Sequence, residues 1–500
     1  MKETLKIPEA DIRRLEKKTH HSGITCWFDV SDVADNQKAF YKAVINGKEY
    51  TQKSVTVNVL PPLPAGPRPL RFKRIVSWAT FGNVYHGTTS SNFMTEAMFP
   101  DVYNLLKSIG LNSYLIFNAD GEKGWRKYLV DHIVKDGGDI WANIPRGFSK
   151  KFTNMHKDGW ETNVISGGVK YVEKISGDYY KRIDKLGYVK AIHYDFEPYN
   201  AYNKPLWEIE ATKKMFAEKY GYKLSSLTKK RLQGELRNKW LDFRTWQIGE
   251  TLRIWAKYVH SVNPDWEITV SQGDGYPMDK YVNYGAYNDI PNLVHMPQIY
   301  LESTMNLSRN IMGLNKTFPN GKFMPVLTAY MVADKDWSAF NSPKTIYSQI
   351  ISAAMLGCVG VAQWPDIHRG MDMEYMWEIS RAMRDISYLE DYVYDGSIFK
   401  DVNIEVENIE VDWSENSIGM AYKLDNKILV AFNNMNNKIS AKVNVQVEDI
   451  SGKNWKVVDP VTNKTISSPS GANWSSEELK HCFTFTVPAS TLGMLILSHN

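Results

Sequence analysis

The feature that most constrains this chain is a series of short apolar segments that alternates with helix-like segments between residues 74 and 365. Eight of the short segments are rich in β-branched and aromatic residues and are bounded by turn residues, which is typical of buried strands: 74–80, 112–118, 139–145, 189–198, 266–272, 293–301, 322–330 and 358–365. Between them, apolar residues recur about every 3.6 positions, as in 94–110, 238–262 and 344–357, which predicts helices. This alternation predicts a closed (β/α)8 barrel, since a doubly wound open sheet typically has fewer strands.

The segments on either side of the predicted barrel lack this alternation. Before it, strand-like segments occur at 24–32, 42–50 and 53–60, and five prolines within 61–70 predict a stiff, extended linker. After it, strand-like segments separated by turn residues occur at 417–424, 425–434, 439–449, 454–460, 482–489 and 492–499. We therefore predict an α/β protein with a β-rich N-terminal segment (1–70), a barrel (71–390) and a C-terminal antiparallel β-sandwich (391–500).

Composition and charge exclude several classes of protein. With 43% hydrophobic and 23% charged residues, the chain is globular, and it has no run of about 18 apolar residues that would span a membrane. Its 60 basic and 56 acidic residues give a net charge of +4 without a long run of like charge, so nucleic acid is not an expected partner. This balance also argues against a strongly anionic polysaccharide but does not exclude one.

Cysteines and the N-terminus say little about the compartment. Cys26, Cys358 and Cys482 lie far apart and form neither a disulfide framework nor a zinc-binding pattern, and we expect no cofactor. Residues 1–18 lack the apolar core of a secretory signal. A signal peptide removed earlier would leave the same chain, and in that case a secreted, periplasmic or cell-surface location is favoured.

Aromatic residues give the first indication of function. They make up 13% of the chain, with 16 Trp and 28 Tyr, and many lie beside turn residues rather than inside apolar runs. Such rings stack on the apolar face of a sugar while their polar edges tolerate water. Large cores also use aromatic residues, so composition by itself favours a carbohydrate-active protein only modestly.

Polar and aromatic residues also end every predicted barrel strand. In a (β/α)8 barrel the catalytic groups come from the C-terminal ends of the strands and from the loops that follow. The expected substrate-binding residues at these ends are Trp78, Trp141, His193, Asp274, Gln298, Tyr300, Trp364 and Asp366.

The end of the fourth strand carries the clearest catalytic pattern. Side chains alternate between the two faces of a strand, so His193, Asp195 and Glu197 share one face, and Pro198 ends the strand because it has no N–H. At about 3.3 Å per residue the two carboxylates lie about 6–7 Å apart, close enough to shift each other's pKa. One protonated acid beside one charged carboxylate is what glycoside hydrolysis requires. The alternative is that both acids form salt bridges at the rim of the barrel.

His193 has two possible roles. A His-x-Asp-x-Glu face could bind a metal, because imidazole and carboxylate are common ligands. Metallohydrolase barrels usually have His-x-His on the first strand, whereas this strand reads SWATFGN. A hydrogen-bonding histidine that orients Asp195 is therefore favoured, and no metal is expected.

Three segments resemble the chitinase-like (family 18) glycoside hydrolases. AIHYDFEP (191–198) is similar to the Asp-x-Glu end of that family's fourth strand, MPQIYL (296–301) to its sixth strand and GVAQWPD (360–366) to its eighth. The sequence differs from the family at His193, where an aspartate is usual, and WANIPRG (141–147) lacks its Ser-x-Gly-Gly.

The resemblance implies a role for four residues. Glu197 would protonate the glycosidic oxygen, and Asp195 would orient a 2-acetamido group whose carbonyl oxygen attacks C1. Tyr300 would hold that group, and Trp364 would stack beneath the sugar.

Other glycosidase mechanisms remain open. Retaining enzymes with glutamates on strands four and seven are disfavoured, because 324–334 contains no glutamate. An inverting enzyme needs a second carboxylate about 6.5–9.5 Å from the acid, and a direct nucleophile needs about 5–5.5 Å. The candidates for this second carboxylate are Asp274, Glu302, Asp334 and Asp366.

The sequence thus predicts a glycoside hydrolase acting on an oligo- or polysaccharide, with Glu197 as the general acid and Asp195 as its charged partner. The rival from another class is a glycan-binding barrel without catalytic activity. A metal-dependent hydrolase that uses His193, Asp195 and Glu197 is a third possibility.

Overall fold

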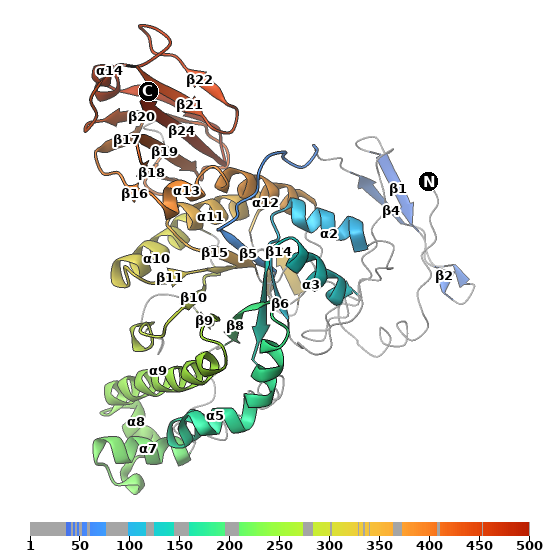
Figure 1. The fold of residues 1–500 in the computed structure, drawn as a ribbon, viewed down its shortest axis with the longest axis vertical. Helices are drawn as coiled ribbons and strands as arrows, with labels where there is room; N and C mark the ends of the chain where they lie inside the picture. The colour runs from blue at the N-terminus through green and yellow to red at the C-terminus, as the bar shows by residue number, and fades with distance from the viewer. Residues whose placement is uncertain are drawn as a thin grey trace.

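A computed structural model gives the fold of the chain (Figure 1). It describes residues 37–41, 44–45, 48–49, 53–57, 61–76, 99–116, 125–144, 160–195, 210–273, 284–300, 303–328, 330–333, 336–339, 341–363, 373–407, 411–452 and 454–499. The predicted strand at 24–32 lies outside these residues.

Eight parallel strands form a closed ring in the middle of the chain. Their order is β5 (Lys73–Val76), β6 (Ser113–Ile116), β7 (Asp139–Asn143), β8 (Val189–Asp195), β9 (Glu267–Gly273), β10 (Leu293–Gln298), a seventh strand made of β11 (Lys322–Phe323) and β12 (Val326–Leu327), and β15 (Gly360–Gln363). The ring is closed because β9 pairs with β10, and β15 pairs with β5. The predicted (β/α)8 barrel is confirmed, with each strand at its predicted place.

The seventh strand differs from its prediction in length. Met324 and Pro325 separate β11 from β12, because proline has no N–H to donate to a neighbouring strand. The Pro325 carbonyl still accepts a hydrogen bond from the Ala362 amide at 3.0 Å. Tyr330, predicted to end this strand, instead begins a hairpin of β13 (Tyr330–Ala333) and β14 (Asp336–Ala339).

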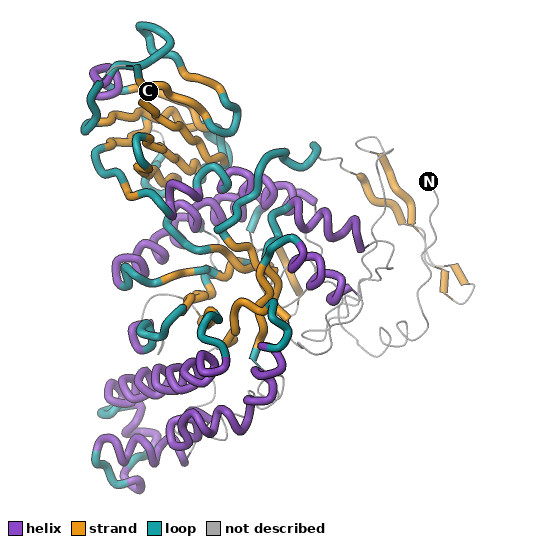
Figure 2. The backbone as a smooth tube through the Cα atoms, viewed as in Figure 1, coloured by secondary structure: helices purple, strands orange, loops and turns teal. Residues whose placement is uncertain are grey.

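Helices connect the barrel strands, and two more follow the last strand (Figure 2). They are α2 (Phe99–Ser108), α3 (Trp125–Lys135), α5 (Trp160–Asp184), α7 (Glu210–Tyr220), α8 (Lys229–Gln233), α9 (Arg237–Val262), α10 (Thr304–Thr317), α11 (Pro343–Met355), α12 (Met373–Ile386) and α13 (Glu390–Tyr394), with short 3-10 turns η3 (Leu224–Ser226) and η5 (Tyr284–Ala286). The helices predicted at 94–110, 238–262 and 344–357 are confirmed as α2, α9 and α11. Within the described ranges, no helix combines the length and the apolar character needed to cross a membrane.

Alternating side chains of the strands fill two separate cores. On β8, Ala191 belongs to the interior of the barrel, whereas Ile192 and Tyr194 pack against the surrounding helices. The interior cluster consists of Leu115, Trp141, Ala191, Val294, Met296, Met324, Val326 and Ala362. The barrel is therefore a packed core and not a channel.

Two antiparallel sheets form the predicted C-terminal sandwich. One sheet has the order β16 (Ser397–Ile398), β18 (Ser417–Leu424), β19 (Lys427–Asn434), β24 (Thr491–His499), β21 (Trp455–Asp459) and β22 (Lys464–Ile466), and the other has β17 (Val402–Val406), β20 (Ala441–Val447) and β23 (Phe483–Val487). The sequence did not predict β16, β17, β22 or the short helix α14 (Ser476–His481).

Up to residue 57, the described residues of the N-terminal segment form strands. The predicted strand at 53–60 is confirmed, the one predicted at 42–50 is instead a pair of two-residue strands, and residues 37–41 form a strand that the sequence did not predict. β1 (Gln37–Tyr41) pairs with β4 (Lys53–Val57), and β2 (Val44–Ile45) pairs with β3 (Lys48–Glu49), both in antiparallel orientation.

The proline-rich segment is docked on the barrel rather than forming a free linker. The Glu390 carboxylate accepts hydrogen bonds from the backbone N–H groups of Leu70, Arg71 and Phe72 at 2.8, 2.9 and 3.2 Å. Arg68 donates to the Ser108 carbonyl at 2.8 Å and to Ser380 Oγ at 2.9 Å. The segment is thus hydrogen-bonded to Ser108 near the start of the barrel and to Ser380 and Glu390 near its end, and these contacts fix its path to β5.

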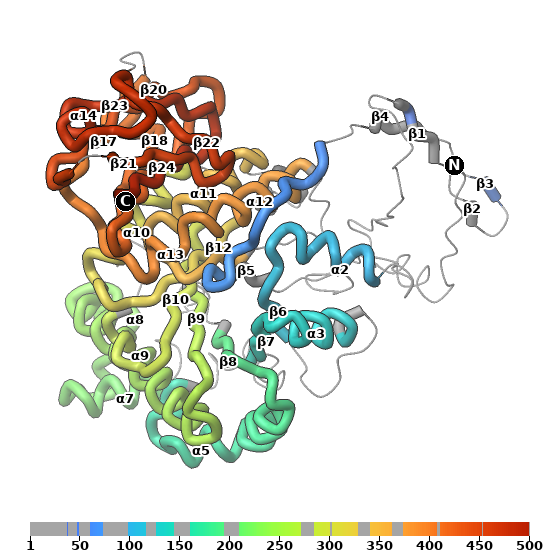
Figure 3. The backbone as a smooth tube through the Cα atoms, turned by 45° about the horizontal axis from the view of Figure 1, so that its top comes forward, coloured from blue at the N-terminus to red at the C-terminus, as the bar shows by residue number. Residues whose placement is uncertain are grey.

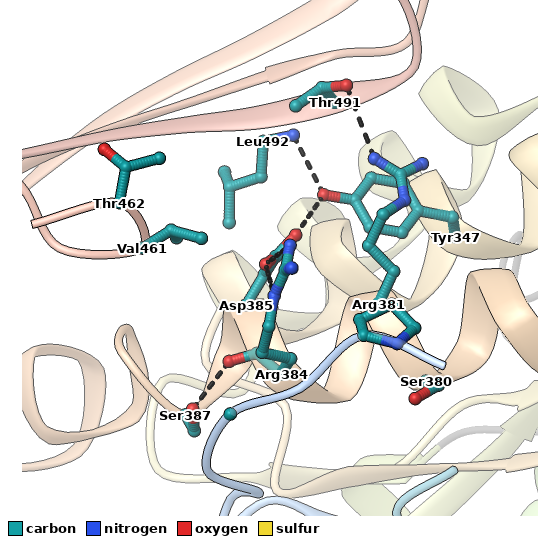
Figure 4. A network of polar contacts seen from close by, with 12 residues as sticks. Tyr347, Ser380, Arg381, Arg384, Asp385, Ser387, Val461, Thr462, Thr491 and Leu492 are labelled. Carbon is teal, nitrogen blue, oxygen red and sulfur yellow. Dashed lines mark hydrogen bonds and ion pairs between the residues drawn. The ribbon is translucent and has the colours of Figure 1, made fainter. Parts of the chain in front are cut away.

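A buried polar network joins the sandwich to the barrel helices (Figure 4). The hydroxyl of Tyr347 on α11 donates to Asp385 on α12 at 2.7 Å and accepts from the Leu492 amide of β24 at 2.9 Å. Arg381 donates to the Ser490 carbonyl at 2.8 Å, and Arg384 donates to Asp385. Burial raises the pKa of Asp385, although Arg384 acts in the opposite direction.

Replacing Tyr347 with phenylalanine should weaken this junction. The substitution leaves the Leu492 amide without its acceptor and one Asp385 oxygen without its donor, so the free energy of unfolding should fall by about 2–4 kcal/mol. Urea unfolding followed by far-UV circular dichroism measures the change. Tyr388→Phe is the control, because this hydroxyl has no hydrogen bond within the described residues, and a loss equal to that of Tyr347→Phe would contradict the assignment.

Candidate active site

The barrel interior changes from apolar to polar toward the C-terminal ends of the strands. On β9, Thr269 and Ser271 are fully buried on the interior face, while Ile268 and Val270 belong to the outer core. Buried polar residues also extend the interior rows of the neighbouring strands: Asn143, His193, Gln298 and Thr328. We call these six residues the polar layer. It lies at the end of the barrel where catalytic groups are expected.

His193 is the central member of the polar layer. Its side chain is fully buried, and its Nδ1 is hydrogen-bonded at 2.8 Å to Oγ1 of Thr269, its register partner on β9. Burial lowers the pKa of His193 to about 3, so the imidazole is neutral at neutral pH. A neutral ring offers one donor and one acceptor without adding a charge to the site.

The predicted acids, Asp195 and Glu197, follow the polar-layer residue His193 in the sequence. Asp195 is the last residue of β8 and stands opposite Ser271 in the register with β9. Its side chain, together with the residues Trp78, Glu197, Asp274, Glu302, Asp334, Trp364 and Asp366, lies outside what the structure describes. Their roles stay predictions.

Two of the expected substrate-binding residues lie at the end of β10. Gln298 is 4% exposed and pairs with Gly273 of β9 and Val326 of β12. Tyr300, two residues further along, is half-buried and packs against the interior cluster. The structure therefore brings Gln298, Tyr300 and His193 to the same end of the barrel.

Trp141 lies deeper than the other expected residues. It pairs with Ala191 in the register of β7 and β8, belongs to the interior cluster and is 1% exposed. Its ring therefore faces protein in this structure, and a role in lining a sugar subsite stays a prediction.

Four members of the polar layer are not among the expected site residues: Thr269, Ser271, Thr328 and Asn143. A signal for the first two was present, since EITVSQ (267–272) alternates polar with apolar residues in the period of a strand. The hydrogen bond from Thr269 to His193 was not predictable from this pattern, because 76 positions separate the two residues.

Ion pairs close the opposite end of the barrel. Lys73, at the start of β5, contacts Asp139 at the start of β7 and Glu267 at the start of β9, the latter at 3.4 Å. Burial disfavours the charged form of Lys73, but Glu267 and Asp139 outweigh it and raise the pKa of the lysine. The charges at this end of the barrel are therefore paired with one another, and the polar layer lies at the other end.

Comparison with known proteins supports the fold. No family model matches the chain, and no curated protein matches it. Among solved structures, a cycloisomaltooligosaccharide glucanotransferase from Paenibacillus sp. in complex with cycloisomaltoheptaose has a TM-score of 0.53 at 10% identity, covering 92% of this chain and 95% of that chain. A β-galactosidase from Bacillus circulans sp. alkalophilus also has a TM-score of 0.53 at 10% identity, covering 81% of this chain and 97% of that chain.

These similarities are similarities of fold. They show that this chain shares the overall fold of these two proteins. They do not show the chitinase-like family to which three segments of the sequence are similar.

The buried histidines should make the protein unstable in acid. His193 and the likewise buried His295 both have a pKa of about 3 in the fold, against about 6.5 when unfolded, so the unfolded chain binds more protons as the pH falls through this window. The free energy of unfolding should decrease between about pH 6 and pH 4, and His193→Asn should reduce that slope by about 1.4 kcal/mol per pH unit.

Urea unfolding at a series of pH values measures the slope. His481→Asn is the matched control, because His481 is exposed. A slope that is the same in His193→Asn and in the wild type would show that His193 does not stay neutral in the fold.

Proposed function

We propose that the protein is a glycoside hydrolase that cleaves an oligo- or polysaccharide at the C-terminal end of the barrel. The observation that carries this proposal is the position of the Asp195-x-Glu197 pair, which directly follows the buried polar layer on β8. The two similar solved structures support it, since both are proteins named for their action on sugars.

In the proposed mechanism, Glu197 is the general acid that protonates the glycosidic oxygen, and Asp195 is the charged partner. By the strand alternation predicted from the sequence, Asp195 and Glu197 continue the row of Ala191 and His193. The neutral imidazole of His193 supplies a hydrogen-bonding group and no positive charge, so it does not favour ionisation of a nearby acid.

Two routes to the second half of the reaction are compatible with this arrangement. In the substrate-assisted route, which the resemblance to the chitinase-like family implies, Asp195 orients an acetamido group and Tyr300 holds it. The half-buried position of Tyr300 beside the interior cluster supports this role. In the two-carboxylate route, Asp274, Glu302, Asp334 or Asp366 supplies the base or nucleophile.

Replacing Glu197 with glutamine tests the general acid. Glutamine keeps the shape but has no transferable proton, so kcat should fall by roughly 10²–10⁴-fold. The assay uses a panel of N-acetylated and plain hexose or pentose oligosaccharides, with products identified by mass spectrometry. Glu210→Gln is the control, because Glu210 is exposed at the start of α7 and should leave kcat unchanged.

The outcomes separate the candidate functions. Cleavage restricted to N-acetylated glycans supports the substrate-assisted route, and cleavage of plain sugars supports the two-carboxylate route. Unchanged activity in Glu197→Gln would remove Glu197 from the mechanism. Binding of sugars without any release of products would assign the protein to the non-catalytic glycan-binding class.

A further inference from the structure

A helical insert with a core of its own follows the fourth barrel strand. It comprises α7, η3, α8 and the start of α9, and we define it as residues 210–242. Phe216, Leu227, Leu232 and Trp240 are buried in a cluster that is separate from both barrel cores. The insert and the C-terminal sandwich lie at opposite ends of the molecule (Figures 1 and 3).

The insert concentrates the positive charge of the chain. It contains nine basic and four acidic residues, a net charge of +5, whereas the whole chain has a net charge of +4. The rest of the protein is therefore close to neutral. Seven of the basic side chains are exposed: Lys214, Lys219, Lys223, Lys229, Lys230, Arg237 and Lys239.

Within the part of the chain that the structure describes, three of the nine basic residues of the insert form ion pairs. Lys223, Lys230 and Arg237 have no acidic partner within the described residues. The ion pairs within the insert involve other cations, with Lys213 on Glu210 at 3.0 Å, Lys214 on Glu218 at 4.0 Å and Arg231 on Glu235.

Aromatic rings hold several cations in place. Lys219 Nζ lies 3.7 Å from the ring centre of Trp246, and Lys239 Nζ lies 5.5 Å from that of Tyr222 and donates to its hydroxyl at 3.1 Å. Arg231 lies 5.9 Å from the same Tyr222 ring. Arg231 lies on α8, Lys239 lies on α9, and Tyr222 follows α7. Cations from two helices therefore lie close together near the end of α7.

A buried ion pair fixes the insert to the barrel. α9 continues from the insert along the barrel and packs against α5, where Arg244 contacts Glu161 at 3.3 Å with both side chains at most 3% exposed. Gln247 adds a hydrogen bond to Thr162 at 3.1 Å. The charged surface therefore has a set position relative to α5 and α9, the helices on either side of β8 in the chain.

We propose that this surface binds an anionic polysaccharide and directs it to the catalytic end of the barrel. That the ligand is a sugar polymer rests on the proposed function as a glycoside hydrolase. A chain of carboxylated or sulfated sugars presents charges at regular intervals, which suits several separate lysines on a rigid support. Single-stranded nucleic acid is less suited, because it needs open rings for base stacking, and the rings of Tyr220, Tyr222 and Trp246 are half-buried.

Charge reversal at the unpaired cations tests the proposal. The triple variant Lys223→Glu, Lys230→Glu and Arg237→Glu should weaken binding of polygalacturonate or chondroitin sulfate roughly tenfold or more. Wild-type binding should itself weaken between about 50 mM and about 300 mM NaCl, because salt screens exposed charges. Isothermal titration calorimetry on the full chain measures both effects.

The matched control reverses the same number of charges on the sandwich. Lys427, Lys456 and Lys464 are also exposed, and replacing all three with glutamate should change the affinity less than about twofold if the site is local. An equal loss in both variants would show a general charge effect and would overturn the proposal.

Further probes separate the possible partners. Equal affinity for neutral dextran, no binding of either anionic glycan, or preferential binding of a DNA duplex would each overturn the proposal. The two anionic glycans distinguish carboxylate from sulfate recognition. Release of sugars is measured separately. Cleavage of neutral glycans without binding of anionic glycans would refute the proposed binding surface and leave the proposed hydrolase activity standing. Binding of anionic glycans without any cleavage would refute the hydrolase activity and leave the binding surface standing.

Discussion

Closure of the barrel depends on the contact between its first and last strands. Gly360 of β15 stands opposite Lys73 of β5, and a Cβ at position 360 would lie 2.1 Å from the Lys73 carbonyl oxygen. Since that oxygen belongs to the backbone, a side chain here would force the two strands apart. The Lys73 side chain also contacts Asp139 and Glu267. Lys73 therefore belongs to the strand pair that closes the barrel and links the first residues of β5, β7 and β9. With one end fixed in this way, the rows of interior side chains have a defined register up to the other end.

That register determines the character of the candidate site. The interior rows pass from the apolar cluster to six buried polar residues, and none of these six is a lysine or an arginine. A positively charged neighbour would hold a carboxylate in its ionised form, whereas a layer of hydroxyls, amides and a neutral imidazole does so much less. The layer therefore suits a site in which one acid must keep a proton while its partner is charged. The same burial that keeps His193 neutral is a source of acid instability, which links the chemistry of the site to the stability of the fold.

The sequence predicted much of this fold because the dominant signals are local. Each barrel strand is a short apolar run between turn residues, and all eight were found in this way, although Pro325 interrupts the seventh. Features that depend on distant partners were missed. Five prolines predicted an extended segment, but its docking depends on Glu390, about 320 positions away. The helix α14 was missed despite a capping box of Ser475 and Glu478, because it lies among strands. For the site, the positions of Gln298, Tyr300 and His193 follow from strand ends, while the pairing of His193 with Thr269 required the sheet register.

The sandwich is better understood as part of the barrel's fold than as a separate module. Seven of the eight residues of β19 are buried, and its side chains alternate between two cores. Ile428, Val430 and Phe432 face the sandwich interior, whereas Leu429 and Ala431 join the core that surrounds the barrel. Asn433 adds hydrogen bonds to the Ser348 carbonyl at 3.0 Å and to Ser352 Oγ at 2.9 Å on α11. A strand buried on both faces cannot leave either partner without exposing apolar surface. Because α11 leads directly into β15, the sandwich supports the strand whose pairing with β5 closes the barrel, and this favours a bracing role for the C-terminal sheets.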